Sequence, residues 1–178
     1  MVGLDLSLTS TGYAIGENGR ARPGLLVPPD GRNRGVRRLA WVRDAVLELA
    51  ASAELVAIEG YSFSSKFSHA HALGELGGVV RLALAEAGAV MVEVPPKCVK
   101  LFASGKGNAS KDEVLVAAVK RLGYGGHSKD EADALWLLMM AGAHYGDSAT
   151  NEHGRRALAA IAWPRLRATS PIHPKASA

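Results

Sequence analysis

Apolar and polar residues alternate with a period of two at the start of the chain, which is the pattern of a β-strand with one buried face. From Val2 to Leu8 every second residue is valine or leucine, and Gly12 ends a turn rich in serine and threonine. We therefore expect two strands within residues 2–15. A third strand is expected near Leu25–Val27, before a pair of prolines.

The chain then changes to a helical pattern, in which apolar residues recur at spacings of three and four. This pattern predicts helices over residues 35–52, 70–88, 111–122 and 130–144, and a short helix over residues 153–161. Short apolar runs predict strands over residues 55–59 and 89–94, and a polar loop is expected over residues 104–110. A strand meander followed by alternating helices and strands predicts an α/β fold with a mixed sheet and helices on its faces.

Composition narrows the class of protein without deciding it. The chain has 178 residues, 48% of them hydrophobic and 21% charged, which fits one domain with a sizeable core. Its net charge of +4 suits a polyanionic partner but does not require one. The single cysteine, Cys98, excludes a disulfide within the chain and a multi-cysteine zinc site. Because we find neither a signal-peptide pattern nor an apolar run long enough to span a membrane, we expect a cytoplasmic protein with no membrane partner.

Two acidic residues lie where the predicted strands would present them at one end of the sheet. Asp5 interrupts the first apolar strand, and between Leu4 and Leu6 its side chain points to the opposite face from its neighbours. Aspartate is a poor strand former, so its presence there suggests a function, although a turn or a buried hydrogen bond explains it as well. Glu59 ends the strand over residues 55–59, and sites in open sheets gather beyond strand ends.

A third acidic group opens the helix predicted over residues 130–144. Asp130 and Asp133 are three residues apart and share one face of that helix, whereas Glu131 lies about 100° round the helix from Asp130. Acids in a first turn also complement the helix dipole and can cap the helix. If these acids converge with those of the strands, their repulsion favours a divalent cation, and oxygen ligands select Mg²⁺ or Mn²⁺. Two such ions about 4 Å apart can activate a water and stabilise the leaving oxygen of a phosphodiester.

Five segments resemble, in order, the motifs of the RuvC-type Holliday junction resolvases, especially short phage-like members. They are GLDLSLTSTGYA, VAIEGY, HALGELGGVVRLAL, VPPKCVKLFASGKGNASKDEV and DEADALWLL, between about residue 2 and residue 145. The resemblance implies a ribonuclease H-like fold with a mixed five-stranded sheet flanked by helices. It also implies a homodimer formed through the helix over residues 70–88. We therefore expect a nuclease domain over residues 1–146 and a basic tail over residues 147–178, part of it disordered.

The resemblance also implies the site and its chemistry. Asp5, Glu59, Asp130 and Asp133 match the family's acidic tetrad, which would hold two Mg²⁺ or Mn²⁺ ions per active site, and Lys111 matches a basic residue that contacts DNA or supports the reacting phosphate. The implied activity is a Mg²⁺-dependent endonuclease that resolves Holliday junctions by paired nicks in the cytoplasm of a prokaryotic or phage-infected cell. One departure concerns the aromatic residue that stacks on the junction in this family, because its aligned position here is Ser62, between Tyr61 and Phe63.

Candidate DNA contacts fall into three groups, each of which could also be a solvated surface. They are Lys97, Lys100, Lys106 and Lys111 in a stretch without acids; Tyr61, Phe63 and Phe67 around Lys66; and Arg34 and Arg37 within an arginine-rich stretch. Lysines, arginines and exposed loop backbone bind phosphates, and aromatic side chains stack on unpaired bases. The tail beyond residue 147 is basic as well and would add nonspecific affinity for DNA.

Three other interpretations remain open at the level of the sequence. Residues 3–12 also resemble the phosphate loop of actin-like ATPases and sugar kinases, but those folds need two such halves and 178 residues leave no room for both. A nuclease of the same fold could prefer forks, flaps or RNA–DNA hybrids. A junction-binding protein without catalysis is the third, although all four tetrad positions are acidic here.

Overall fold

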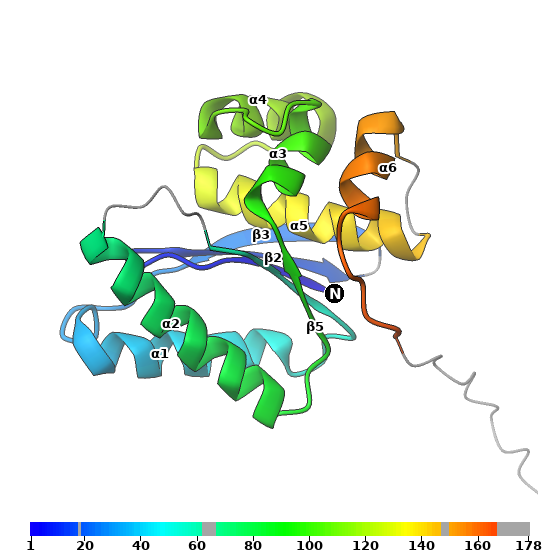
Figure 1. Cartoon of the computed structure of the whole chain (residues 1–178). Coiled ribbons are helices and arrows are strands. Elements are labelled where there is room, and N and C mark those ends of the chain that lie inside the picture. Colours follow the sequence, from blue (N-terminus) through cyan, green and yellow to red (C-terminus); the bar gives the residue numbers. More distant parts are fainter. Residues whose placement is uncertain (18, 62–66, 147–149, 167–178) are drawn as a thin grey trace, which may run out of the picture.

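A five-stranded mixed sheet forms the centre of the molecule, with its strands in the order β3-β2-β1-β4-β5 (Figure 1). The computed structural model describes residues 1–17, 19–61, 67–146 and 150–166, with the backbone alone for residues 67–69. The strands are β1 (Val2–Asp5), β2 (Thr11–Glu17), β3 (Arg20–Leu26), β4 (Val56–Glu59) and β5 (Met91–Val94). β1, β2 and β3 pair antiparallel, whereas β1, β4 and β5 pair parallel. The predicted α/β fold with a mixed five-stranded sheet is therefore confirmed.

Helices cover both faces of this sheet (Figure 1). They are α1 (Gly35–Ala50), α2 (Phe67–Glu86), α3 (Pro96–Ser104), α4 (Lys111–Leu122), α5 (Lys129–Tyr145) and α6 (Glu152–Ala159). α1 and α2 pack together on one face, and α5 lies on the other with α3, α4 and α6 around it. In the part of the chain that the structure describes, no helix has both the length and the apolar character needed to cross a membrane.

Each face of the sheet has its own core, because strand side chains alternate between faces. Val2, Leu4 and Ile58 point towards α1 and α2, where they form a buried cluster with residues of both helices. Ala57, Val92 and Val94 belong to the opposite cluster, together with α5. Asp5 and Glu59 each follow a residue of the first cluster, so the alternation turns both acids towards α5.

Glycines bring α5 into direct contact with β1 and β2. A Cβ atom at Gly3 would overlap the carbonyl oxygen of Ala134, and one at Gly12 would overlap the carbonyl of Asp130. Gly12 is also the partner of Asp5 in the ladder between β1 and β2. The start of α5 therefore lies directly over the end of β1, because no side chain separates the two backbones.

Three elements differ from the prediction. β1 ends at Asp5 and does not continue to Leu8. β3 begins at Arg20, well before the predicted Leu25, because this largely exposed edge strand contains Pro23 and Gly24, residues that argue against a strand in a sequence. The helix α3 was not predicted, because we interpreted Pro95 and Pro96 only as the end of a strand. Pro96 is in fact the first residue of this helix, a position that favours proline.

We expect Gly3→Ala to destabilise the protein by about 1–3 kcal/mol or more, because the added methyl group must push α5 away from the sheet. Urea denaturation followed by circular dichroism would measure the change. Gly125→Ala is the matched control, since no heavy atom lies within 4 Å of a Cβ at that position. Equal stability of Gly3→Ala and the control would show that α5 does not rest on the backbone of β1.

Candidate active site

Three carboxylates converge at one end of the sheet. Asp5 ends β1, Glu59 ends the adjacent parallel strand β4, and Asp133 lies in the first turns of α5. Each offers a carboxylate oxygen, and these atoms all lie within 4.8 Å of one another. The parallel register, which pairs Leu4 with Ile58, brings the two strand ends together. The contact of α5 with Gly12 brings Asp133 to the same place.

Lys111, the first residue of α4, places its ammonium group over this cluster. Its Nζ lies 3.2 Å from Asp133 Oδ2, 3.3 Å from Asp130 Oδ1 and 3.5 Å from Asp5 Oδ2. The Lys111 side chain is 50% exposed, whereas those of Asp5 and Asp133 are almost fully buried. The ammonium group is therefore at the mouth of the site, between the acids and solvent.

Asp130 lies at the edge of the cluster and is not one of the three converging acids. Its Oδ1 contacts Lys111, and its Oδ2 accepts a hydrogen bond from Ser10 Oγ at 3.2 Å. Ser10 belongs to the turn between β1 and β2, so this bond ties that turn to the start of α5. The sequence placed Asp130 in the tetrad but contained no signal for its partner Ser10, which lies 120 residues away.

Helix caps fix the two helix starts that carry these residues. Ser110 and Glu113 form a capping box at the start of α4, and this arrangement sets the position of Lys111. Ser128 caps α5 by accepting a hydrogen bond from the Glu131 amide. The Glu131 carboxylate accepts a hydrogen bond from the buried hydroxyl of Tyr124. Glu131 therefore stabilises the start of α5, in agreement with the sequence-based inference that it lies apart from Asp130 and Asp133.

Burial and mutual repulsion raise the pKa values of the three converging acids. Burial raises the pKa of Asp5 to about 7, because the effect of Lys111, which lowers it, is smaller. Burial, together with the neighbouring charge of Asp5, raises the pKa of Glu59 to about 10. Burial also raises the pKa of Asp133, against the opposing effect of Lys111. For Lys111, burial alone would lower the pKa, but the three surrounding aspartates raise it. The cluster therefore retains protons at neutral pH unless a cation replaces them.

The residues present fit a hard divalent cation. Asp5 Oδ2 is buried and accepts no hydrogen bond from any residue that the structure describes, although Lys111 Nζ is 3.5 Å away. All three converging groups are carboxylates, the donors that Mg²⁺ and Mn²⁺ prefer. A buried oxygen without a partner costs free energy. A cation would provide that partner and would relieve the repulsion that raises the pKa values.

The predicted DNA-contacting lysines lie beside the acid cluster on α3 and in the turn after it. Lys97 and Lys100 line a cavity of about 550 Å³ together with Tyr61. Lys100 is close enough to Asp133 to lower its pKa, although burial dominates. Lys106 is exposed, and its Nζ lies 3.4 Å from Glu113 Oε1.

The remaining predicted contacts lie at the start of α1 or have side chains outside the part of the chain that the structure describes. Arg34 and Arg37 are exposed at the start of α1, on the face of the sheet opposite α5. Phe63 and Lys66 fall outside the described residues, and of Phe67 only the backbone, the first residue of α2, is described.

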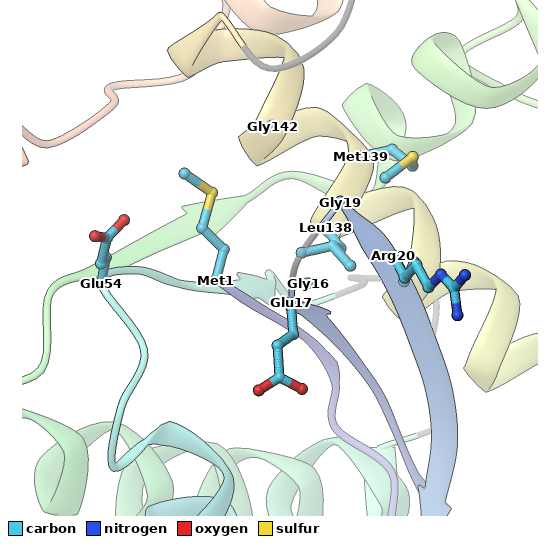
Figure 2. Close-up of a pocket in the computed structure, with 10 residues that line it drawn as sticks. Met1, Gly16, Glu17, Gly19, Arg20, Glu54, Leu138, Met139 and Gly142 are labelled. Atoms are coloured by element: carbon cyan, nitrogen blue, oxygen red, sulfur yellow. The ribbon is translucent and has the colours of Figure 1, made fainter.

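A second cavity of about 570 Å³ lies at the other end of the strands and does not include the predicted site (Figure 2). Met1, Glu17 and Leu138 line it. Met1 precedes β1 and Asp5 ends it, so the length of that strand separates this cavity from the acids. In open sheets, sites form beyond the carboxyl ends of the parallel strands, where the acid cluster lies.

Fold and site together define a metal-dependent nuclease with a ribonuclease H-like fold. The family model of the crossover junction endodeoxyribonuclease RuvC matches residues 1–141. A RuvC from Synechococcus sp. (strain WH7803) is 34% identical over 147 residues, which are 78% of this chain and 95% of the relative. One from Hyphomonas neptunium (strain ATCC 15444) is 32% identical over 152 residues, which are 81% of this chain and 90% of the relative. The chain belongs to the RuvC family of endonucleases.

Solved structures agree with this assignment. Thermus thermophilus RuvC in complex with a Holliday junction substrate superposes with a TM-score of 0.64 and 27% identity. The match covers 84% of this chain and 98% of the Thermus chain. Family membership and the ribonuclease H-like fold, which the resemblance implied, are thereby confirmed.

The raised pKa values predict that metal-free protein loses stability as the pH rises. A carboxyl whose pKa is higher in the folded state holds a proton that the unfolded chain releases, so its contribution is complete below the unfolded values of 3.8 and 4.5. That contribution disappears as the pH passes about 7 for Asp5 and continues to fall towards about 10 for Glu59. We expect the free energy of unfolding in EDTA to fall by about 2 kcal/mol per pH unit between pH 5.5 and 7, because the folded state holds nearly two more protons than the unfolded chain.

Urea denaturation across this pH range measures the slope. Asp5→Asn should flatten it, and added Mn²⁺ should do the same in the wild-type protein because the cation takes the place of the protons. Asp112→Asn is the control, since this acid is exposed and pairs with Lys129 outside the cluster. A stability independent of pH in EDTA would contradict the raised pKa values.

Proposed function

We propose that this protein resolves Holliday junctions by hydrolysing a phosphodiester bond in each of two opposite strands. The observation that carries the proposal is the buried cluster of Asp5, Glu59 and Asp133 beneath Lys111, in a chain of the RuvC family. The same family relationship supports branched DNA as the substrate, since the matched Thermus structure contains a Holliday junction. We place the protein in the cytoplasm of a prokaryotic or phage-infected cell, where such DNA is found.

Asp5, Glu59 and Asp133 would hold divalent cations, Mg²⁺ or Mn²⁺, and two ions per site would require Asp130 as a further ligand. Such ions, when bound, stabilise charge on a phosphate and lower the pKa of water. The protein contributes the geometry, because strand ends and a capped helix hold the carboxylates before the cations bind. It also excludes solvent, because Asp5 and Asp133 are buried.

Lys111 would neutralise the scissile phosphate. Its ammonium group now contacts Asp5, Asp130 and Asp133, whose charge would be shared with cations in the loaded site. Half of the Lys111 side chain is exposed, so the ammonium group can reach a phosphate that approaches from solvent. The raised pKa keeps this group charged throughout the neutral range.

The DNA would lie along the basic side of the site. Lys97, Lys100 and Gly107 line the cavity beside the acids, and the exposed Lys106 precedes Gly107 in the chain. These groups suit the phosphates of a strand that enters the site. Phe63, Lys66, Phe67, Arg34 and Arg37 remain predicted contacts. Tyr61 has one ring face under the Arg81 guanidinium, so only the opposite face could meet a base.

A homodimer would bring two such sites to one junction, and α2 offers the surface for it. Gly74, Gly78 and Leu82 are spaced by four residues and share one side of this helix. A Cβ at either glycine would have no heavy atom within 4 Å, and Leu82 is 60% exposed. Glycine lowers the stability of a helix, so two of them beside an exposed leucine favour close contact with a second helix.

Cleavage of an immobile four-way junction in Mg²⁺ tests the function. We expect paired, symmetric nicks by the wild-type protein, and a loss of at least about 10³-fold for Asp5→Asn because the site then lacks a buried charge for the cation. Lys111→Met should lower kcat by about 10²–10³-fold, since it removes a preorganised charge at the phosphate.

A fork, a flap, a duplex and an RNA–DNA hybrid serve as comparison substrates in the same assay. Equal or faster cutting of forks or flaps would retain the nuclease but contradict the preference for junctions. Tight junction binding without cutting of any substrate would contradict the nuclease activity and would indicate a junction-binding protein. Lys120→Gln on the exposed end of α4 controls for the loss of one positive charge.

Gly78→Glu should disrupt the proposed dimer, because it places two charges where the helices would meet. Sedimentation velocity should show a shift from dimer to monomer, and junction affinity should fall by at least about tenfold because one of two linked binding sites is lost. Val116→Glu is the control, since it adds the same charge to a different helix, α4, at a residue that is 48% exposed. An unchanged dimer in Gly78→Glu would exclude α2 as the interface.

A further inference from the structure

Arg81 of α2 reaches the ends of both β4 and β5, and it was not among the site residues predicted from the sequence. Its side chain is only 21% exposed. Nε and Nη2 both lie 3.1 Å from Glu93 Oε2 on β5, and Nη1 donates to the Tyr61 hydroxyl at 3.0 Å. Nη2 also donates to the main-chain carbonyl of Glu59 at 3.4 Å. One guanidinium group therefore joins the helix to three points around a candidate cation ligand.

The contact with Glu59 completes a restraint on one peptide group. The amide of Gly60 donates to the carbonyl oxygen of Val94 at 2.8 Å, and the carbonyl of Glu59 belongs to the same peptide unit. A peptide group is planar, so fixing both its N–H and its C=O fixes its orientation. Arg81 does so from the α2 side of the sheet, whereas the Glu59 carboxylate points to the α5 side. Both polar groups of the Glu59–Gly60 peptide therefore have a partner, one on β5 and one on α2.

Tyr61 adds a second attachment immediately after this peptide. Its hydroxyl donates to the Gly74 carbonyl at 3.4 Å, and its ring lies 4.6 Å beneath the Arg81 guanidinium carbon. A Cβ at Gly77 would overlap both the Tyr61 hydroxyl and Arg81 Nη1. Gly77 and Arg81 are four residues apart on one helix face, and the glycine provides the space in which arginine and tyrosine meet.

We propose that Arg81 is a positioning residue, which holds the Glu59–Gly60 peptide so that the Glu59 carboxylate faces Asp5 and Asp133. It acts through the backbone of Glu59 and touches neither DNA nor cation. Partners that orient a metal ligand commonly affect metal affinity by about 10–100-fold. The inference rests on the proposed cation site of Asp5, Glu59 and Asp133, but it does not require that the protein cut junctions.

Arg81→Gln tests the proposal through the affinity for Mn²⁺, measured by the electron paramagnetic resonance signal of free Mn²⁺ without DNA. We expect the Kd to rise by at least about tenfold relative to wild type. Hydrogen exchange at the Gly60 amide should become faster, because its peptide group loses one of its two restraints. Arg81→Lys should give an intermediate Kd, since one ammonium group cannot reach Glu93, Tyr61 and the Glu59 carbonyl together. Lys120→Gln, which removes an exposed positive charge of α4, should leave the Kd unchanged.

A Kd for Mn²⁺ and a Gly60 exchange rate equal to those of wild type in Arg81→Gln would overturn the proposal. If Arg81→Gln does not fold, Arg81→Lys decides in the same two measurements, with an unchanged Kd again against it. In junction cleavage, excess Mn²⁺ should restore most of the activity of Arg81→Gln, as a purely structural defect would not. A wild-type protein that binds Mn²⁺ but cuts no junction would refute the proposed function and leave this inference to the Kd and exchange measurements.

Discussion

Three carboxylates lie within 4.8 Å of one another, and two of them are buried. Their mutual repulsion and the loss of their hydration disfavour the charged forms, and the surrounding residues must offset that electrostatic cost. Burial raises the pKa of Asp5 to about 7 and that of Glu59 to about 10, so part of that cost is removed by protons in the metal-free protein. Lys111 relieves a further part from the mouth of the site. The fold must nevertheless hold the acids together, since they would separate if their supports were free to move.

Rigid supports provide that restraint. The glycines of β1 and β2 let α5 lie directly on the sheet, which fixes the distance between Asp5 and Asp133. Ser128, Glu131 and Tyr124 hold the start of the same helix. These groups lie on the α5 side, whereas Glu59 is held from the other side of the sheet through its own backbone. The positions of the three acids thus depend on packing contacts and hydrogen bonds made by other residues.

The sequence predicted the parts of this arrangement that local patterns encode. Strand alternation identified the face to which Asp5 turns, Glu59 was found at the end of an apolar strand, and helix periodicity placed Asp130 and Asp133 on one helical face. It failed where the local pattern is weak. β3 is an exposed edge strand interrupted by Pro23 and Gly24, and α3 begins at a proline that also follows the end of a strand. The roles of Ser10, Tyr124 and Arg81 were not predicted, because they depend on contacts with residues far apart in the sequence. The helix over residues 111–122 was predicted with the bounds that α4 has, and the S-x-x-E pattern of Ser110 and Glu113, which was not used, indicates the same start.

The same repulsion links the stability of the protein to its chemistry. A set of acids optimised for stability would be spread apart or paired one by one with cationic side chains, and it would then have no unsatisfied oxygen for a divalent ion. Here one half-exposed lysine faces three aspartates, and Asp5 Oδ2 accepts no hydrogen bond from the described residues. The repulsion among the acids of the metal-free site therefore raises its affinity for cations. Holding the acids together costs free energy of folding, and a bound cation removes that cost. This requires that the supports be stronger than the repulsion, and the direct contacts of Gly3 and Gly12 with the backbone of α5 provide such a support.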